Sequence, residues 1–380
     1  MVLHATDPAT IYLAVHARAP EATVAAIDDA MFERRSMLRT LAMRRTLFVA
    51  TNHLLAAVER SSSVTVAATE RKRLQKFLAE SGIADPADWL SAVFQEVLDV
   101  LADHPEGLPA RELTKVAPVL GTRILMGAGT KNAVEAGATS RVLGLMAVEG
   151  QIVRGRPTGD WTSRTYRWHR RDSWWPDGDP VESVEPFDEP QASIELLTRW
   201  LARFGPATIE DMKWWTGWTV SKTKRTLAGV DTVEVELEVD VELETEVEVN
   251  VEGTSHRETG FVLADDAEPV EASEPWAALL PALDPTAMGW KQRGWYLGDH
   301  RLELFDRNGN IGPTVWADGR IVGGWSQRPD GEVVTELLEP VGTEQQRMID
   351  ERADAVAAFV GSTVVKPSFP TPLQKRLSAG

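Results

Sequence analysis

The sequence has no cysteine, no long apolar run and no metal-binding histidine motif, and each absence excludes a class of protein. Without cysteine the 380-residue chain forms neither disulfides nor thiolate metal sites, which is typical of the reducing cytosol. No apolar run approaches ~18 residues and the N-terminus has no signal-peptide pattern, so we expect neither a membrane span nor secretion. The seven histidines lack metal-ligand spacing, and we expect no metal and no cofactor.

The chain is acidic, with a formal net charge of −17, but nine of its acids lie in one tract. Residues 233–252 alternate apolar and acidic residues and contain no basic residue, so the rest of the chain carries only −8. A period of two predicts a strand with one apolar face, in one or both arms of a hairpin. The tract is either a mimic of a phosphate backbone or a solvated repeat, and blocks of like charge favour the solvated repeat.

Residues 110–171 carry the opposite charge. They contain eleven basic and four acidic residues, a local net charge of +7, and Arg outnumbers Lys by nine to two. Arginine suits bidentate contacts with phosphate. A local excess of this kind indicates nucleic-acid contact in spite of the acidity of the whole chain.

One pattern of three helices followed by two strands appears three times. In the central copy we expect helices over 86–103, 107–118 and 131–148, then a hairpin of 150–157 and 164–170. The third copy has helices over 190–205, 206–217 and 219–229 and strands over 230–238 and 259–265. The first copy has helices over 8–18 and 23–34 and strands over 37–43 and 46–50. This order is that of the winged-helix variant of the helix-turn-helix.

The predicted fold class is therefore α+β: tandem winged-helix domains, three in number and the first incomplete at its N-terminus, with a C-terminal β-rich piece. We expect the domains to be 1–85, 86–172, 188–272 with the acidic insertion 233–252, 273–340, and a terminal helix and polar tail over 341–380. Linkers are expected at 170–190 and 265–275. Asp318-Gly319 predicts a two-residue turn between two strands, and an amphipathic helix is expected over 343–361.

Several segments resemble the winged-helix DNA glycosylase family typified by AlkZ. They are VLHATDPATIYLAVHARAP at the start, GDWTSRTYRW, LLPALDPTAMGWKQR and GPTVWADGRIVGGW. The resemblance covers nearly the whole chain except the acidic tract. It implies tandem winged-helix domains and a monofunctional DNA glycosylase that hydrolyses the N-glycosidic bond of alkylated bases in DNA repair. Family members usually have a helical segment ahead of the first motif, so we expect a misassigned start or a truncated first domain.

The family's catalytic motif is Gln or His, an apolar residue, then Gln or Asp, usually followed by Asp-Pro. The matching stretch is His4-Ala5-Thr6-Asp7-Pro8, in which Thr6 departs from the pattern. An N-alkylated purine leaves as a cationic base, so the reaction needs a positioned water and a stabilised sugar cation more than an acid. Neutral His4 suits the water, Thr6 offers a hydroxyl and Asp7 a negative charge. Asp7-Pro8 is equally typical of a helix N-cap.

Basic residues at the predicted hairpin tips, in the basic stretch 110–171 and in the C-terminal β piece are candidate DNA contacts, with solvated surface as the alternative. They are Arg39, Arg44, Arg45, Arg123, Arg154, Arg156, Arg164, Lys291 and Arg293.

Three functions are compatible with these patterns: a DNA glycosylase, a non-catalytic winged-helix DNA-binding protein or regulator, and a protein-interaction module built on the acidic hairpin. Regulators usually carry one winged helix per protomer, so three fused copies favour the repair enzyme. We therefore expect a cytoplasmic, nucleoid-associated monomer that acts on double-stranded, alkylated DNA.

Overall fold

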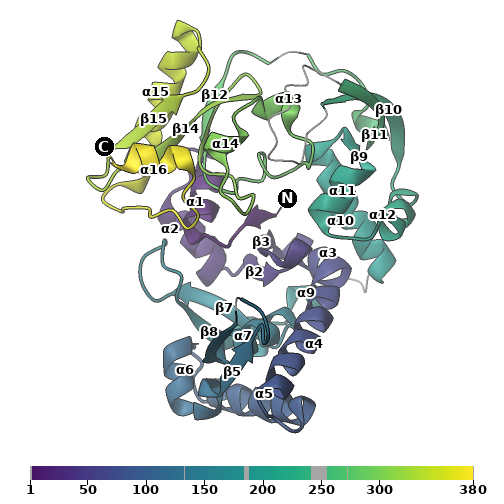
Figure 1. Ribbon diagram of the computed structural model, residues 1–380, viewed down its shortest axis with the longest axis vertical. Helices are drawn as coiled ribbons and strands as arrows, with labels where there is room; N and C mark the ends of the chain where they lie inside the picture. Colours follow the sequence, from purple (N-terminus) through teal and green to yellow (C-terminus); the bar gives the residue numbers. More distant parts are fainter. Residues whose placement is uncertain (1, 132, 184–187, 241–254, 272, 380) are drawn as a thin grey trace.

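The computed structural model describes residues 2–131, 133–183, 188–240, 255–271 and 273–379. These residues form helices and five small sheets, so the mixed α/β character is as expected. Figure 1 shows an N-terminal sheet near the middle of the molecule, with a lower lobe below it. An upper lobe (189–263) and a C-terminal lobe (277–379) lie on the opposite side of that sheet from the lower lobe (Figure 1).

The N-terminal sheet has helices between its first two strands. Its elements are β1 (Leu3–His4), α1 (Pro8–His16), α2 (Val24–Asp28), the π-helical turn η1 (Asp29–Glu33), β2 (Met37–Leu41), the 3-10 turn η2 (Met43–Arg45) and β3 (Leu47–Thr51). Strand β3 pairs with both others, so the order is β1-β3-β2. Helix α1 begins where the Asp7 carboxylate accepts a hydrogen bond from the Ala9 N–H and Pro8 sets the first helical φ. This start of α1 leaves β1, with His4, at the edge of the sheet.

The lower lobe follows a helical connection made of α3 (Asn52–Val58), η3 (Glu59–Ser63) and α4 (Val64–Glu80). Its elements are α5 (Pro86–Ala102), β4 (Leu108–Pro109), α6 (Ala110–Val116), η4 (Pro118–Gly121), β5 (Arg123–Met126), β6 (Val134–Gly137), α7 (Thr139–Val148), β7 (Ile152–Pro157) and β8 (Tyr166–Arg170). The sheet order is β4-β8-β7. Apolar residues at helical spacing on α5, among them Val93, Val97 and Leu101, are buried in the core of this lobe.

The helix expected over 131–148 is wrong for its first half. Residues Val134–Gly137 form β6, which pairs with β5 so that Gly137 lies opposite Arg123. Helix α7 begins only at Thr139, after the Ala138 N–H has donated to the Thr122 carbonyl. Alanine and glutamate favour a helix locally, but here the hairpin partner satisfies the backbone groups instead.

The segment expected as a linker over 170–190 is packed in part against the rest of the chain, through the buried Trp174 and Val181. It contains the short helices α8 (Arg171–Trp174) and α9 (Pro180–Ser183). The Arg171 guanidinium pairs with Glu59 at 2.8 Å and also with Asp179, and all three side chains are largely buried. This buried ion-pair network fixes the segment against η3. The second expected linker contains the 3-10 turn η5 (Ala264–Asp266) and otherwise irregular chain.

The upper lobe follows the expected helices closely. Its elements are α10 (Glu189–Phe204), β9 (Ala207–Thr208), α11 (Ile209–Thr216), α12 (Val220–Leu227), β10 (Thr232–Asp240) and β11 (Ser255–Leu263). The strand order is β10-β11-β9. Helix α11 starts with a capping box between Thr208 and Asp211 and ends at Gly217, whose φ is 72°. Of the acidic tract, residues 241–252 lie outside the described residues.

The sheets of the N-terminal region, the lower lobe and the upper lobe, each with three strands, share one topology. In each, the strand that comes last in the chain is central, and the two earlier strands flank it. The three are β1-β3-β2, β4-β8-β7 and, in reverse direction, β9-β11-β10.

The C-terminal lobe is built on a four-stranded sheet of order β12-β13-β14-β15. Its elements are β12 (Ala277–Leu280), α13 (Gly294–Leu297), α14 (Arg301–Leu304), β13 (Thr314–Ala317), β14 (Arg320–Gln327), β15 (Val333–Leu337), α15 (Thr343–Val360) and α16 (Pro372–Ala379). Asp318 and Gly319 both have positive φ, 47° and 87°, as the predicted two-residue turn requires. Within the expected β-rich piece 273–340, α13 and α14 are short helices, and the expected polar tail contains α16.

Helices α15 and α16 cover different faces of this sheet. Successive residues of a strand point to opposite faces. Ile321 packs in one apolar cluster with Leu373 of α16, and Val322 packs in another with Ile349 of α15. Within the residues that the structure describes, there is no helix with the length and apolar character needed to cross a membrane.

Candidate nucleic-acid interface and active site

His4 lies on the edge strand β1 in an apolar environment. The residue is 9% exposed, and its ring packs edge-on against Phe48, with ring centroids 5.6 Å apart. Phe48 in turn lies 6.4 Å from the ring of Trp215 on α11. The His4 Nδ1 accepts a hydrogen bond from the Thr6 N–H at 3.4 Å. The imidazole is therefore held in a nearly dry position, in an aromatic cluster that also includes α11 of the upper lobe.

Arg44 lies in the turn η2, and its side chain reaches the same helix. Its guanidinium carbon is 4.0 Å from the centroid of the Trp214 ring. At the end of α11, a Cβ on Gly217 would lie 3.2 Å from the Arg44 backbone nitrogen. Glycine therefore permits the close approach that places Arg44 on Trp214. Within the described chain Arg44 forms no ion pair, and its buried Nε has no hydrogen-bond partner.

Arg293 approaches Trp214 from the C-terminal lobe. The residue is 4% exposed, and its guanidinium carbon lies 4.7 Å from the Trp214 centroid and 5.2 Å from that of Phe305. Its Nε donates to the Trp290 carbonyl at 2.9 Å. Trp214 thus contacts two guanidinium groups that come from segments far apart in the chain. We call His4, Arg44, Trp214 and Arg293 the central cluster.

Asp211 holds the segment that carries Arg293. One carboxylate oxygen accepts from the Thr208 N–H and hydroxyl, as part of the capping box of α11. The other accepts from the backbone N–H groups of Lys291 and Gln292, at 2.9 and 3.1 Å. Asp211 is 2% exposed. One buried carboxylate therefore ties the start of α11 to the loop just before Arg293.

The electrostatics of the central cluster favour neutral histidine and a bound anion. Burial, and then the charge of Arg44, lowers the pKa of His4 to about 3. Burial, and then the charge of Arg293, lowers the pKa of Arg44 to about 10. His4 is therefore neutral at physiological pH while Arg44 stays charged. A buried cation without a counterion is costly, and an incoming anion relieves that cost.

The other two candidate catalytic residues have separate surroundings. Thr6 is exposed, and only its backbone N–H contacts His4. Asp7 is buried: it caps α1 and accepts hydrogen bonds from the backbone N–H of Ser368, at 3.2 Å, and from its hydroxyl, at 2.5 Å. The carboxylate of Asp7 thus has structural partners on two sides, in α1 and in the C-terminal lobe.

Arg39 and Arg154 form a second arginine pair, between the N-terminal sheet and the lower lobe. The Arg39 guanidinium lies 4.0 Å from the Tyr166 centroid and donates to the Gly155 carbonyl at 3.2 Å. Arg154 lies 4.7 Å from the Trp168 centroid, and burial together with Arg39 lowers its pKa to about 10. Arg39 is buried, which leaves it no access to phosphate in this conformation, whereas Arg154 is half-buried and forms no ion pair within the described residues.

The remaining predicted DNA contacts already have partners in the structure. The ion pairs are Arg45 with Glu70 at 2.5 Å, Arg123 with Glu135 at 3.1 Å, Arg156 with Asp28 and Glu33 at 2.9 and 2.7 Å, and Lys291 with Glu210 at 3.1 Å. Arg164 donates to the Ser368 hydroxyl. The structure therefore gathers His4, Arg44 and Arg293 at one place and Arg39 and Arg154 at another, and it leaves Arg45, Arg123 and Arg164 outside both groups.

Sequence reasoning missed Trp214 and Asp211 as functional positions. A tryptophan pair at this spacing favours a core role, which holds for the buried Trp215. Neighbouring helical residues point about 100° apart, so Trp214 faces a different direction from the buried Trp215. The adjacency of the two tryptophans is therefore the sequence feature that could have indicated an accessible ring at Trp214. Asp211 carries the ordinary signature of a capping box, and nothing local marks its contacts with residues 291 and 292.

Comparison with known proteins identifies the family of the chain. A family model described as "DNA glycosylase AlkZ-like" matches residues 1–359. No curated protein sequence matches the chain. The solved structure of Streptomyces sahachiroi DNA glycosylase AlkZ is similar, with a TM-score of 0.65 and 20% sequence identity over 94% of this chain and 88% of that chain, which shows a shared fold. The resemblance noted in the sequence is thus confirmed: the chain belongs to the AlkZ-like DNA glycosylase family, and its function is that of a DNA-repair glycosylase.

Proposed function

We propose that this glycosylase hydrolyses the N-glycosidic bond of alkylated purine bases in double-stranded DNA, with the reaction centred on His4. The observation that carries the proposal is the central cluster, in which Arg44 stacks on Trp214 beside His4 and has no ion pair within the described residues. Two arginines on one aromatic ring, beside a neutral histidine, suit a backbone phosphate next to a reacting sugar.

A bound phosphate would also reduce the repulsion between the cationic cluster and its positively charged substrate. An alkylated purine and the developing sugar cation are both positive, and the charge of Arg44, which has no ion pair within the described residues, would repel them. When a DNA phosphate binds Arg44 and Arg293, it neutralises part of their charge and brings a negative group beside the sugar. The arginines then hold the strand in place while the base departs with the electrons of the glycosidic bond.

His4 acts in this scheme as a neutral group that orients the attacking water. With Nδ1 accepting from the Thr6 N–H, the proton of the imidazole is on Nε2, which donates to a water oxygen. The opposite tautomer gives up only this long 3.4 Å hydrogen bond and leaves Nε2 as the acceptor. The exposed Thr6 hydroxyl supplies a second contact for the water, and Asp7 fixes the start of α1 and lends its negative charge to this end of the sheet.

The repeated sheet topology supports a tandem winged-helix architecture for binding the duplex. Each of the three sheets has its last strand in the centre, after helices that lie between the first and second strands. That is the strand order that a winged helix needs to present one helix and one hairpin to DNA. We assign the three copies to 1–85, 86–172 and 188–272, followed by 273–340 and 341–380. Arg154, on the hairpin of the second copy, is the leading phosphate contact there, and the protein acts as a cytoplasmic monomer at the nucleoid.

The experiment that tests the proposal measures base release from a duplex containing one 7-methylguanine, under single-turnover conditions. We expect His4→Ala to lower the rate at least ~100-fold, the usual range for loss of a group that handles a proton or positions water. His104→Ala is the matched control, because His104 is a partly exposed histidine of the lower lobe. Equal rates for both variants would place the reaction away from His4.

A further inference from the structure

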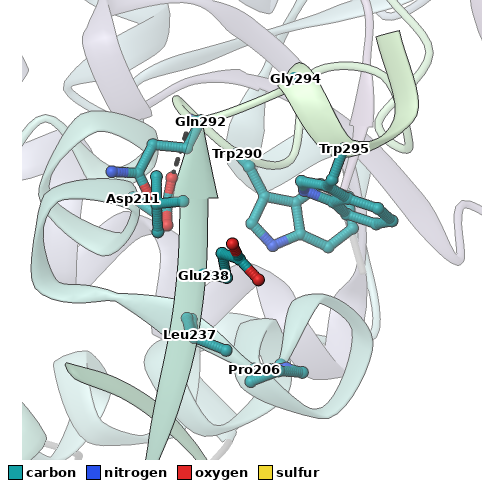
Figure 2. A pocket seen from close by; sticks show the side chains of 10 residues that line it. Pro206, Asp211, Leu237, Glu238, Trp290, Gln292, Gly294 and Trp295 are labelled. Atoms are coloured by element: carbon teal, nitrogen blue, oxygen red, sulfur yellow. Dashed lines mark hydrogen bonds between the residues drawn. The ribbon is translucent and has the colours of Figure 1, made fainter. Parts of the chain in front are cut away.

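A cavity of about 260 Å³ lies between strand β10 and the segment 290–295, which also carries Arg293 of the central cluster. Figure 2 shows Trp290 and Trp295 on one side of it, and Pro206 and Leu237 on the other. The Glu238 carboxylate points into the space between them (Figure 2). The sequence motifs did not mark this pocket.

Its aromatic wall has a fixed geometry. The Trp290 and Trp295 rings meet edge to face, with centroids 5.2 Å apart and an interplanar angle of 83°. Trp290 is anchored, since its indole N–H donates to the Phe204 carbonyl at 2.9 Å and its ring meets Phe204 at 90°. Trp295 is 55% exposed, an unusual position for so large an apolar side chain. The wall therefore offers an ordered tryptophan and a second one open to solvent.

The charge around the pocket has one sign. Among the described residues that line it, none is basic, and two are acidic, Asp211 and Glu238. The Asp211 carboxylate already accepts four hydrogen bonds, from Thr208, Lys291 and Gln292. Glu238 is exposed, and its carboxylate points into the pocket, where it faces an incoming ligand (Figure 2). Tryptophan faces and a carboxylate together attract a flat organic cation.

We propose that the Trp290–Trp295–Glu238 pocket binds a flat, positively charged heteroaromatic ring. Such a ring comes either from an alkylated purine displaced from the duplex or from a free heteroaromatic cation. In the first case the inference rests on the proposed function, and the pocket is where the enzyme distinguishes a charged lesion from a neutral base. Tryptophan stacks on any base, so the preference for a charged base over a neutral one comes from the carboxylate.

The position of the pocket fits this role. Asp211, on its wall, belongs to the same helix α11 as Trp214, on which Arg44 and Arg293 stack. The segment 290–295 supplies both aromatic rings of the pocket and, with Arg293, one guanidinium of the central cluster. The pocket and the two arginines are therefore linked through α11 and the segment 290–295, and they carry opposite charges.

The test titrates the full-length protein with two ligands of the same shape, N-methylquinolinium, which is permanently charged, and quinoline, which is neutral at physiological pH. Ligand-observed NMR gives the two dissociation constants. We expect the cation to bind at least about tenfold more tightly than quinoline. Glu238→Gln removes that preference, and Trp295→Leu weakens both ligands. The matched controls are Glu236→Gln, whose carboxylate pairs with Arg257, and Trp276→Leu, an exposed tryptophan of the C-terminal lobe.

A second arm identifies the source of the cation. If the occupant is the lesion base, Glu238→Gln slows base release from 7-methylguanine duplex about tenfold and leaves the affinity for undamaged duplex unchanged. If the occupant is a free cation, base release is unchanged while N-methylquinolinium binding is still lost. Equal affinity for N-methylquinolinium and quinoline, or binding untouched by both pocket variants, overturns the proposal. Because the first arm needs no catalysis, a wild-type protein without base release would refute the proposed function and still report on the pocket.

Discussion

Arg44, in the turn between β2 and β3, stacks 4.0 Å above the ring of Trp214 on α11, and Gly217 at the end of that helix makes room for its backbone. The contact joins the N-terminal sheet to the upper lobe. A cation over a tryptophan contributes about 0.5–2 kcal/mol, which offsets only part of the cost of burying an unpaired guanidinium. We therefore propose that Arg44 serves DNA binding more than stability.

Replacing Arg44 by methionine separates these two roles. We expect Arg44→Met to change the melting temperature by no more than ~3 °C, because it removes a buried charge and keeps an apolar contact with Trp214. The same variant should weaken binding to undamaged duplex at least about tenfold, since a direct contact with phosphate is lost. Fluorescence anisotropy and differential scanning calorimetry measure the two effects.

Arg45→Met is the control for that experiment. Arg45 is the next residue, has a similar positive φ of 58°, and pairs with Glu70 instead of stacking on an aromatic ring. Its replacement should leave DNA affinity within about twofold, since its charge is already paired on the surface. Equal losses of affinity in both variants would mean that the turn contributes only general positive charge.

Asp211 is the residue whose loss should damage both stability and DNA binding. In Asp211→Asn, one of the two oxygens becomes an N–H₂ group that faces N–H donors, so either the capping box or the contact with Lys291 and Gln292 is broken. We expect a loss of about 3 kcal/mol in the free energy of unfolding, measured by urea denaturation. DNA affinity should fall as well, because the segment that carries Arg293 is released. Glu210→Gln, at the neighbouring half-buried acid, should cost under ~1 kcal/mol.

The depressed pKa of His4 predicts a specific dependence of stability on pH. Burial lowers the pKa of His4 to about 3 in the folded protein, whereas the solvated imidazole of the unfolded chain keeps its ordinary pKa of 6.5. Between these values the unfolded chain binds a proton that the folded protein does not, so the free energy of unfolding falls as the pH falls. Relative to about pH 7.5, this effect amounts to about 2 kcal/mol at about pH 5.

His4→Gln removes that contribution and keeps a side chain of similar polarity. Denaturation of both proteins at each pH shows whether the wild type loses stability faster than the variant on acidification. The comparison with the variant cancels the contributions of His16 and His169, whose pKa values burial also lowers. Parallel pH profiles would mean that the His4 ring is hydrated, which contradicts its position in the structure.

Arg154 and Arg123 provide a matched pair for the lower lobe. Both lie in strands, but Arg154 stacks on Trp168 without an ion pair in the described chain, while Arg123 pairs with Glu135. We expect Arg154→Ala to reduce the slope of log affinity against log salt concentration by about 0.9, and Arg123→Ala to change it by less than ~0.3. A larger change for Arg123 would place the duplex on the β5–β6 hairpin instead.

The parts of this fold that sequence predicts well are those fixed by neighbouring residues. Asp7-Pro8 marks the start of α1, and Asp318-Gly319 marks the turn between β13 and β14, because both depend on backbone angles and hydrogen bonds within a few residues. The helix predicted over 131–138 is wrong because pairing with β5 determines the structure of this stretch. The same holds for α16, whose buried Leu373 packs against the sheet of the C-terminal lobe.

The central cluster shows the same limit more sharply. A sequence motif marks His4 as a candidate site residue, and charge and position in the sequence mark Arg44 and Arg293. Nothing in the sequence indicates that the two arginines share the ring of Trp214, because that contact depends on how three distant segments pack. Charge alone also failed to separate Arg44 from Arg45, since the ion pair with Glu70 is a property of the folded chain.

The most direct test of the account is a double substitution across the proposed contact between Arg44 and DNA. Single-turnover release of 7-methylguanine is measured for wild type and Arg44→Met, on a normal duplex and on one with a neutral methylphosphonate at each phosphate flanking the lesion in turn. If Arg44 binds a phosphate beside the lesion, one such position slows the wild type about as much as Arg44→Met does, by roughly tenfold or more, and combining the two changes adds less than about twofold. Fully multiplicative losses at both flanking phosphates would contradict it.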